Sequence, residues 1–153
     1  MKKLCGIVVA SLAALAIATP ATSQSLDRTF VVQLTATEEV PLCAATDQSD
    51  RGVALFQIVD FAAGIVEYTV IATDLPGTLA GAPGAHIHGP APAGDTAGIV
   101  QPLTLTGVEV GVIATGTFTN PQLVAAALEN PELFYVNVHT TTCPDGAIRG
   151  QVG

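Results

Sequence analysis

Short runs of alternating apolar and polar residues, each bounded by turn residues, constrain the fold of this chain more than any other feature. Residues 52–59 and 65–73 form two such runs around the short segment 60–64. Because strand side chains point to alternate faces, these runs predict half-buried strands joined by a hairpin, with Gly64 at positive φ. Further strands are predicted at residues 30–36, 85–88, 99–105, 111–119, 133–140 and 147–152. The pattern predicts an all-β sandwich or barrel.

One segment departs from the alternation and predicts a helix. Asn120 can cap the helix, Pro121 suits its first position, and residues 122–129 are strong helix formers. We expect one short helix that crosses between two strands.

The chain begins with a segment typical of export signals. Two lysines precede an apolar run over residues 4–18, and small residues follow at the spacing of a cleavage site. The run is short for a membrane-spanning helix, so no membrane span is expected after cleavage. We predict a signal peptide over residues 1–23, one domain over residues 24–153, and export to the periplasm or the extracellular space.

The predicted mature chain is strongly acidic. Without the two lysines of the signal, three arginines remain against thirteen carboxylates, a formal net charge of −10. A domain with this charge repels polyanions. The composition therefore argues against nucleic acid or anionic lipid as a partner.

Two cysteines remain beyond the predicted signal, Cys43 and Cys143. Export to an oxidising compartment makes a disulfide between them the expected state, and two buried free thiols are the alternative. The bond would close a loop of about 100 residues and stabilise the fold by roughly 4–5 kcal/mol in the chain-entropy model.

All three histidines of the sequence lie in two of the predicted strands. His86 and His88 are two positions apart, so they share one strand face while Ile87 points to the core. His139 lies in the strand at residues 133–140. If the two strands are neighbours, three imidazoles converge and form a copper or zinc site with an open coordination position. The alternative is that these are ordinary histidines on a solvated strand face.

Other polar residues are candidate partners for the free ring nitrogens of the histidines. Tyr135 and Asn137 share the strand face of His139, and Asp95 and Asp145 lie in loops. Each of them, taken singly, is also compatible with an ordinary surface position.

The remaining charged residues give no catalytic pair. Glu38 and Glu39 are adjacent, so they point to opposite strand faces, and we expect both to be solvated at a strand end. Arg149 is expected to pair with a carboxylate in the last strand. The sequence contains no Gly-x-Ser-x-Gly elbow, phosphate-binding loop or dinucleotide fingerprint, so we identify no catalytic residue.

Several segments, taken in order, resemble the CHRD domain, a module named after chordin and also found singly in exported bacterial proteins. They cover nearly the whole predicted mature chain and lie at residues 30–41, 52–54, 68–70, 85–91, 135–140 and 146–152. The resemblance implies an immunoglobulin-like or superoxide-dismutase-like Greek-key sandwich. It implies no general biochemical activity.

The chain is more distantly similar to copper/zinc superoxide dismutases, which also place a His-x-His pair on the outer face of a Greek-key barrel. That likeness would imply four copper histidines, one of them bridging to a zinc ion, but this sequence has 3 histidines in all. A complete two-metal site is therefore excluded, and a reduced copper site is not.

The leading hypothesis is an exported β-sandwich that acts as a binding or interaction module. Its partner would be an extracytoplasmic protein or a single copper or zinc ion held by His86, His88 and His139. A copper-dependent redox enzyme with superoxide-dismutase-like activity is the alternative, and a structural envelope or matrix component is a third. The sequence favours binding over catalysis.

Overall fold

The fold is built on one antiparallel sheet of eight strands, with the order β5-β4-β7-β8-β1-β2-β3-β6. The structure, a computed structural model, describes residues 28–81 and 84–153, so the predicted signal peptide at residues 1–23 lies outside the described residues. The strands are β1 (Arg28–Thr35), β2 (Arg51–Asp60), β3 (Ile65–Thr73), β4 (Ala85–His88), β5 (Ile99–Pro102), β6 (Gly111–Thr119), β7 (Tyr135–Val138) and β8 (Ile148–Gln151).

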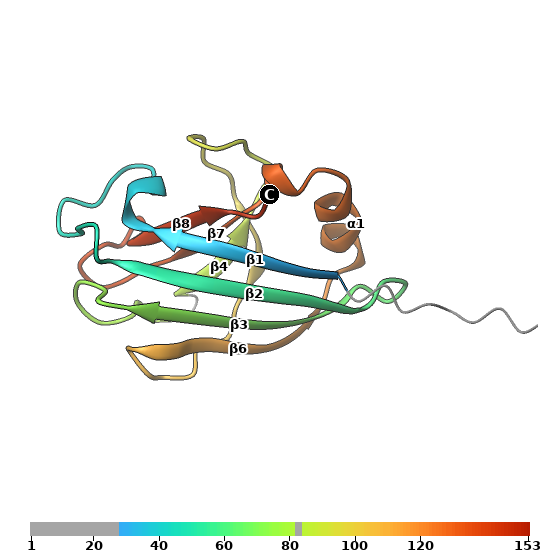
Figure 1. Cartoon of the computed structure of the whole chain (residues 1–153), viewed down its shortest axis with the longest axis horizontal. Coiled ribbons are helices and arrows are strands. Elements are labelled where there is room, and N and C mark those ends of the chain that lie inside the picture. The colour runs from blue at the N-terminus through green and yellow to red at the C-terminus, as the bar shows by residue number, and fades with distance from the viewer. Residues whose placement is uncertain (1–27, 82–83) are drawn as a thin grey trace, which may run out of the picture.

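The sheet curls into two layers, with β1, β2, β3 and β6 in front of β4, β7 and β8 (Figure 1). Strands β1 and β8 pair at Thr35 and Arg149, where one layer passes into the other. Beyond β5, Leu105 forms a bridge to Ala114 of β6, so the two edges of the sheet meet. The all-β prediction is confirmed. The immunoglobulin-like or superoxide-dismutase-like assignment stays a prediction.

The front layer follows the alternation that the sequence predicts. In β2, Ala54, Phe56 and Ile58 are buried, whereas Leu55 and Val59 between and after them are exposed. Strand β3 continues the same pattern, and its bounds agree with the prediction. The core lies between this layer and the inward side chains of the back layer.

The turn between β2 and β3 requires glycine at its last position. Gly64 has φ 69°, and a Cβ there would lie 2.3 Å from the Cα of Pro121. The Asp60 carboxylate accepts a hydrogen bond from the backbone N–H of Ala63 at 2.9 Å, which closes the turn. The predicted hairpin and its positive φ are confirmed.

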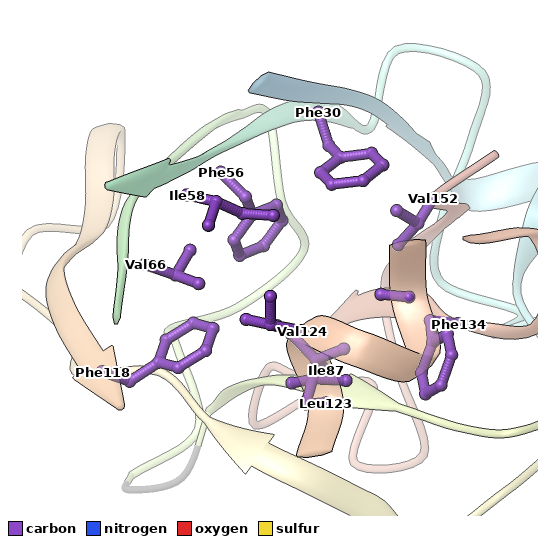
Figure 2. A pocket seen from close by; sticks show the side chains of 11 residues that line it. Phe30, Phe56, Ile58, Val66, Ile87, Phe118, Leu123, Val124, Phe134 and Val152 are labelled. Atoms are coloured by element: carbon purple, nitrogen blue, oxygen red, sulfur yellow. The ribbon is translucent and has the colours of Figure 1, made fainter. Parts of the chain in front are cut away.

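The predicted helix is present as α1 (Pro121–Glu129). The Asn120 side chain accepts a hydrogen bond from the N–H of Leu123 at 3.0 Å, as expected of an N-cap. Leu123 and Val124 are buried and close one end of the core, where they line a small apolar pocket together with side chains of both layers (Figure 2). In the part of the chain that the structure describes, no helix is long and apolar enough to span a membrane.

Two short 3₁₀ helices were not predicted, η1 (Ala36–Glu38) and η2 (Pro131–Leu133). Because η1 follows β1 and η2 precedes β7, β1 ends earlier and β7 begins later than the alternation suggests. The strand predicted at residues 133–140 is therefore only four residues long, Tyr135–Val138.

Candidate metal centre

Strands β4 and β7 are neighbours in the back layer, which brings the two histidine motifs together. His86 lies opposite Asn137, and His88 lies opposite Tyr135. Side chains directly opposite each other in an antiparallel pair share a face, so these four side chains point to the outer side of the sheet. His139 follows β7 by one residue, and its N–H continues the pairing by donating to the carbonyl of Gly84 at 2.8 Å.

The three imidazoles converge as the sequence predicts. Each histidine offers a ring nitrogen, and these three nitrogens all lie within 4.8 Å of one another. The ring of His86 lies 5.3 Å from that of His88 and 4.9 Å from that of His139, measured between centroids. Nitrogen ligands at about 2.0–2.1 Å from one ion lie at most about 4.2 Å apart, so a shared ion requires the rings to move slightly closer together.

Backbone carbonyls fix the orientation of two of the rings. The Nδ1 atom of His88 lies 2.9 Å from the carbonyl oxygen of Ala97, and the Nδ1 atom of His139 lies 2.8 Å from that of Pro144. A carbonyl only accepts, so each Nδ1 carries the proton, and in the neutral ring the lone pair is on Nε2. Both Nε2 atoms are buried and have no hydrogen-bond partner among the described residues. Metal-bound histidines have this arrangement, in which the second ring nitrogen donates to a carbonyl or carboxylate.

The histidine face is not solvated. His86 is 4% exposed and His88 is 9% exposed, so the expectation of an open, solvated strand face is wrong for this pair, whereas metal binding stays a prediction. Burial lowers the pKa of His88 from its usual 6.5, and the hydrogen bond to Ala97 acts in the opposite direction. In the metal-free protein His88 therefore favours the neutral imidazole, which is the form that binds a metal ion.

Tyr135 and Asn137 support the site in two different ways. The Tyr135 ring stacks on His88 with a centroid distance of 4.7 Å and an angle of 2° between the planes. Its hydroxyl contacts Ala97, the residue that also holds His88, accepting from its N–H at 3.1 Å and donating to its carbonyl at 3.3 Å. Asn137 donates to both carboxylate oxygens of Glu39 at 3.2 Å.

Glu39 corrects an expectation of the sequence analysis. It is 3% exposed, not solvated at a strand end, because the 3₁₀ helix η1 turns its side chain inward onto Asn137. Burial raises the pKa of Glu39 above its ordinary value of 4.5, while the hydrogen bonds from Val40 and Asn137 and the charge of Arg149 oppose that shift. The adjacent Glu38 is exposed as expected.

The environment of Arg149 also differs from the sequence-based expectation of a carboxylate partner. Its side chain is 1% exposed, and its guanidinium carbon lies 3.5 Å from the centroid of the Tyr135 ring. One guanidinium nitrogen donates to the side-chain oxygen of Gln151 at 3.3 Å. In the described part of the chain its nearest partners are thus an aromatic face and an amide, although its charge acts on Glu39.

A pocket of about 270 Å³ lies against His88 and His139. Glu39, Thr96 and Asp145 also line it, whereas Asp95 does not. The pocket therefore opens beside two of the three imidazoles. No lysine or arginine is among the described residues that line it.

The predicted disulfide joins Cys43 to Cys143 and closes a loop of 100 residues. It fixes the turn after β7, in which the N–H of Gly146 donates to the carbonyl of Cys143 at 3.1 Å. The next residue after Cys143 is Pro144, whose carbonyl orients His139. The disulfide therefore holds a loop that contributes directly to the histidine cluster.

The curled antiparallel sheet and its covered histidine face define an all-β domain. The chain belongs to the CHRD domain family, whose family model matches residues 30–152. No curated protein and no solved structure matches the chain.

Proposed function

We propose that this CHRD domain is an exported binding module that holds one copper or zinc ion through His86, His88 and His139. The observation that carries the proposal is the orientation of His88 and His139. Their Nδ1 atoms donate to the carbonyls of Ala97 and Pro144, which leaves the buried Nε2 lone pairs as ligands. The nitrogens of all three histidines lie within 4.8 Å of one another, so a small movement of the rings brings them to the spacing of ligands around a single ion.

Export is part of the proposal. The predicted signal peptide at residues 1–23 supports it, and the disulfide is compatible with an oxidising compartment. Periplasmic and extracellular locations fit these features equally well.

A copper-dependent redox enzyme with superoxide-dismutase-like activity is the second candidate. The pocket beside His88 and His139 favours it, because catalytic metal sites keep one position open for substrate. The charge of the surroundings opposes it. Superoxide is an anion, and Asp145, with no lysine or arginine among the described lining residues, lines the pocket of a chain with a formal net charge of −8. We therefore place binding before catalysis.

Titration of the metal-free protein with Zn(II) or Cu(II) tests the proposal. We expect a stoichiometry of one ion per chain, with an affinity that falls as the pH drops through about 6.5, because the ligands must be neutral imidazoles. The double replacement His86→Ala, His88→Ala should abolish binding. His139→Ala should also abolish binding. Because His139 is half-buried, this replacement should disturb the fold less than replacement of the buried His86 and His88. Equal affinity in the wild type and in a folded variant would refute the site, and superoxide turnover by the copper form would favour the enzyme.

A further inference from the structure

Three buried side chains form a stack behind the histidine cluster. The His88 ring lies parallel to the Tyr135 ring at a centroid distance of 4.7 Å, and the Arg149 guanidinium carbon lies 3.5 Å from the centroid of the same tyrosine ring. Two planar groups this close cannot share one face of a ring. Strand β7 lies between β4 and β8 in the sheet, so His88 and Arg149 approach Tyr135 from opposite sides. The guanidinium is thus separated from a candidate metal ligand by one aromatic ring.

The stack is fixed in place and shielded from solvent. Arg149 is 1% exposed and Tyr135 is 3% exposed. The Tyr135 hydroxyl and the Nδ1 atom of His88 both donate to the carbonyl oxygen of Ala97, which holds the two rings in register. A buried charge is poorly screened by water and salt, so Arg149 acts on its surroundings at close to full strength.

This charge discriminates between ions of different valence. Three neutral imidazoles supply no negative charge, so a bound dication keeps its charge of +2 and Cu(I) keeps +1. A fixed positive charge repels the dication with twice the energy that it repels the monocation. Two carboxylates near the pocket act in the opposite sense. Asp145 is exposed and therefore screened by solvent, and the burial of Glu39 raises its pKa and so favours the neutral carboxyl, which leaves Arg149 as the buried fixed charge beside the cluster.

We propose that the Arg149–Tyr135–His88 stack makes the three-histidine site select Cu(I) over the divalent ions Zn(II) and Cu(II). This inference rests on the proposed function, since it assumes that the histidines bind a metal. It adds to that function the oxidation state of the bound copper ion. Arg149 is a positioning and charge-setting residue here and does not touch the ion.

The test compares Cu(I) with Zn(II), which share a filled d shell and differ by one charge. Affinities are measured anaerobically by competition with bicinchoninate for Cu(I) and with a chelating dye for Zn(II). In Arg149→Met we expect the affinity for Zn(II) relative to Cu(I) to rise about tenfold, the order expected for one poorly screened unit charge near the ion. Arg149→Lys keeps the charge, so the ratio of the Zn(II) affinity to the Cu(I) affinity should stay within about threefold of the wild-type ratio.

Arg28→Met is the matched control. Arg28 also lies over an aromatic ring, 5.2 Å from the centroid of Phe30, but it is exposed at the start of β1. Its removal changes the net charge by the same amount and should leave the ratio unchanged. An equal ratio in the wild type and a folded Arg149→Met variant would overturn the inference.

A measurement on the wild type covers the case in which Arg149→Met does not fold. The reduction potential of bound copper reports the relative affinity for the two copper ions directly. We expect a potential above that of the aqueous Cu(II)/Cu(I) couple, since that result means tighter binding of Cu(I). A lower potential would overturn the inference while the proposed function stands. Failure to bind any of the three ions would instead refute the proposed function, and the inference with it.

Discussion

The two layers of the sheet differ in what covers their outward side chains. In the front layer these side chains face solvent, and Val31 of β1 is 58% exposed while Leu55 of β2 is 36% exposed. In the back layer the outward residues His86 and His88 are 4% and 9% exposed. Three loops cover them, at residues 39–41, 89–98 and 140–146. Burial on the back layer is therefore set by loops, and these loops fix the polar groups that they cover.

Loss of the disulfide should have the largest effect on the back layer. Replacement of Cys43 and Cys143 by Ser should lower the free energy of unfolding by up to roughly 4–5 kcal/mol, the chain-entropy value for a loop of this length. It should also weaken Zn(II) binding, because Pro144 beside Cys143 holds His139. Urea denaturation and metal titration measure the two effects. Unchanged Zn(II) affinity in the folded double variant would show that the loop does not organise the site.

A matched pair of core and surface truncations sharpens the contrast between the layers. Ile87 lies between two histidines of the back layer and is 6% exposed, so Ile87→Ala should cost about 2–5 kcal/mol of the free energy of unfolding. Val31→Ala in the front layer should change it by less than about 0.5 kcal/mol. Urea denaturation of both variants checks the pair. Similar losses would mean that the outer face of the front layer is covered by something other than solvent.

Truncation of outward amides tests the loop cover itself. Asn137→Ala removes the donor to both oxygens of the buried Glu39 carboxylate, so we expect a loss of about 1–3 kcal/mol of the free energy of unfolding. Gln57→Ala on the exposed face of β2 is the front-layer control, with an expected change below about 0.5 kcal/mol. If urea denaturation showed a similarly small change in the free energy of unfolding for Asn137→Ala, the hydrogen bonds from Asn137 would not hold the loop at residues 39–41.

The contrast between the solvent-facing front layer and the loop-covered back layer explains which features could be predicted from the sequence. Alternation located β3, β4 and β6 with correct bounds, and the signals at Asn120, Pro121 and Gly64 gave the helix and the hairpin. The i, i+2 spacing of His86 and His88 was enough to place both rings on one face. These features depend only on local geometry.

The burial of that face could not be predicted, because it depends on loops distant in the sequence. Glu39 reaches Asn137 across 98 residues, and no local pattern marks that contact. The position of Arg149 over Tyr135 depends on the register between β7 and β8, in which Asn137 lies opposite Arg149. Buried arginines are usually paired with a carboxylate, so the prediction of a carboxylate partner followed the usual case, whereas among the described residues Arg149 contacts Tyr135 and Gln151.

The smallest expected effect is a change in pH dependence at Glu39. Burial raises the pKa of Glu39, so its contribution to stability is fully present below the unfolded value of 4.5 and is lost as the pH rises through the raised folded value. Glu39→Gln removes this contribution. The wild type should therefore gain stability relative to the variant as the pH falls from 8 towards about 4.5.

Urea denaturation across this pH range measures the difference, with Glu67→Gln on the exposed side of β3 as a control for the loss of one negative charge. A wild type that loses stability relative to Glu39→Gln on acidification would contradict the buried position of Glu39.

X-ray absorption spectroscopy of the Zn(II)- or Cu(I)-loaded protein tests the central claim most directly, because it counts the imidazoles around the ion. We predict three histidine nitrogens at about 2.0–2.1 Å, and the loss of one imidazole from the shell in His139→Ala. A shell of oxygen ligands with no imidazole scattering, or an identical shell in the wild type and His139→Ala, would contradict the claim that His86, His88 and His139 form the metal centre.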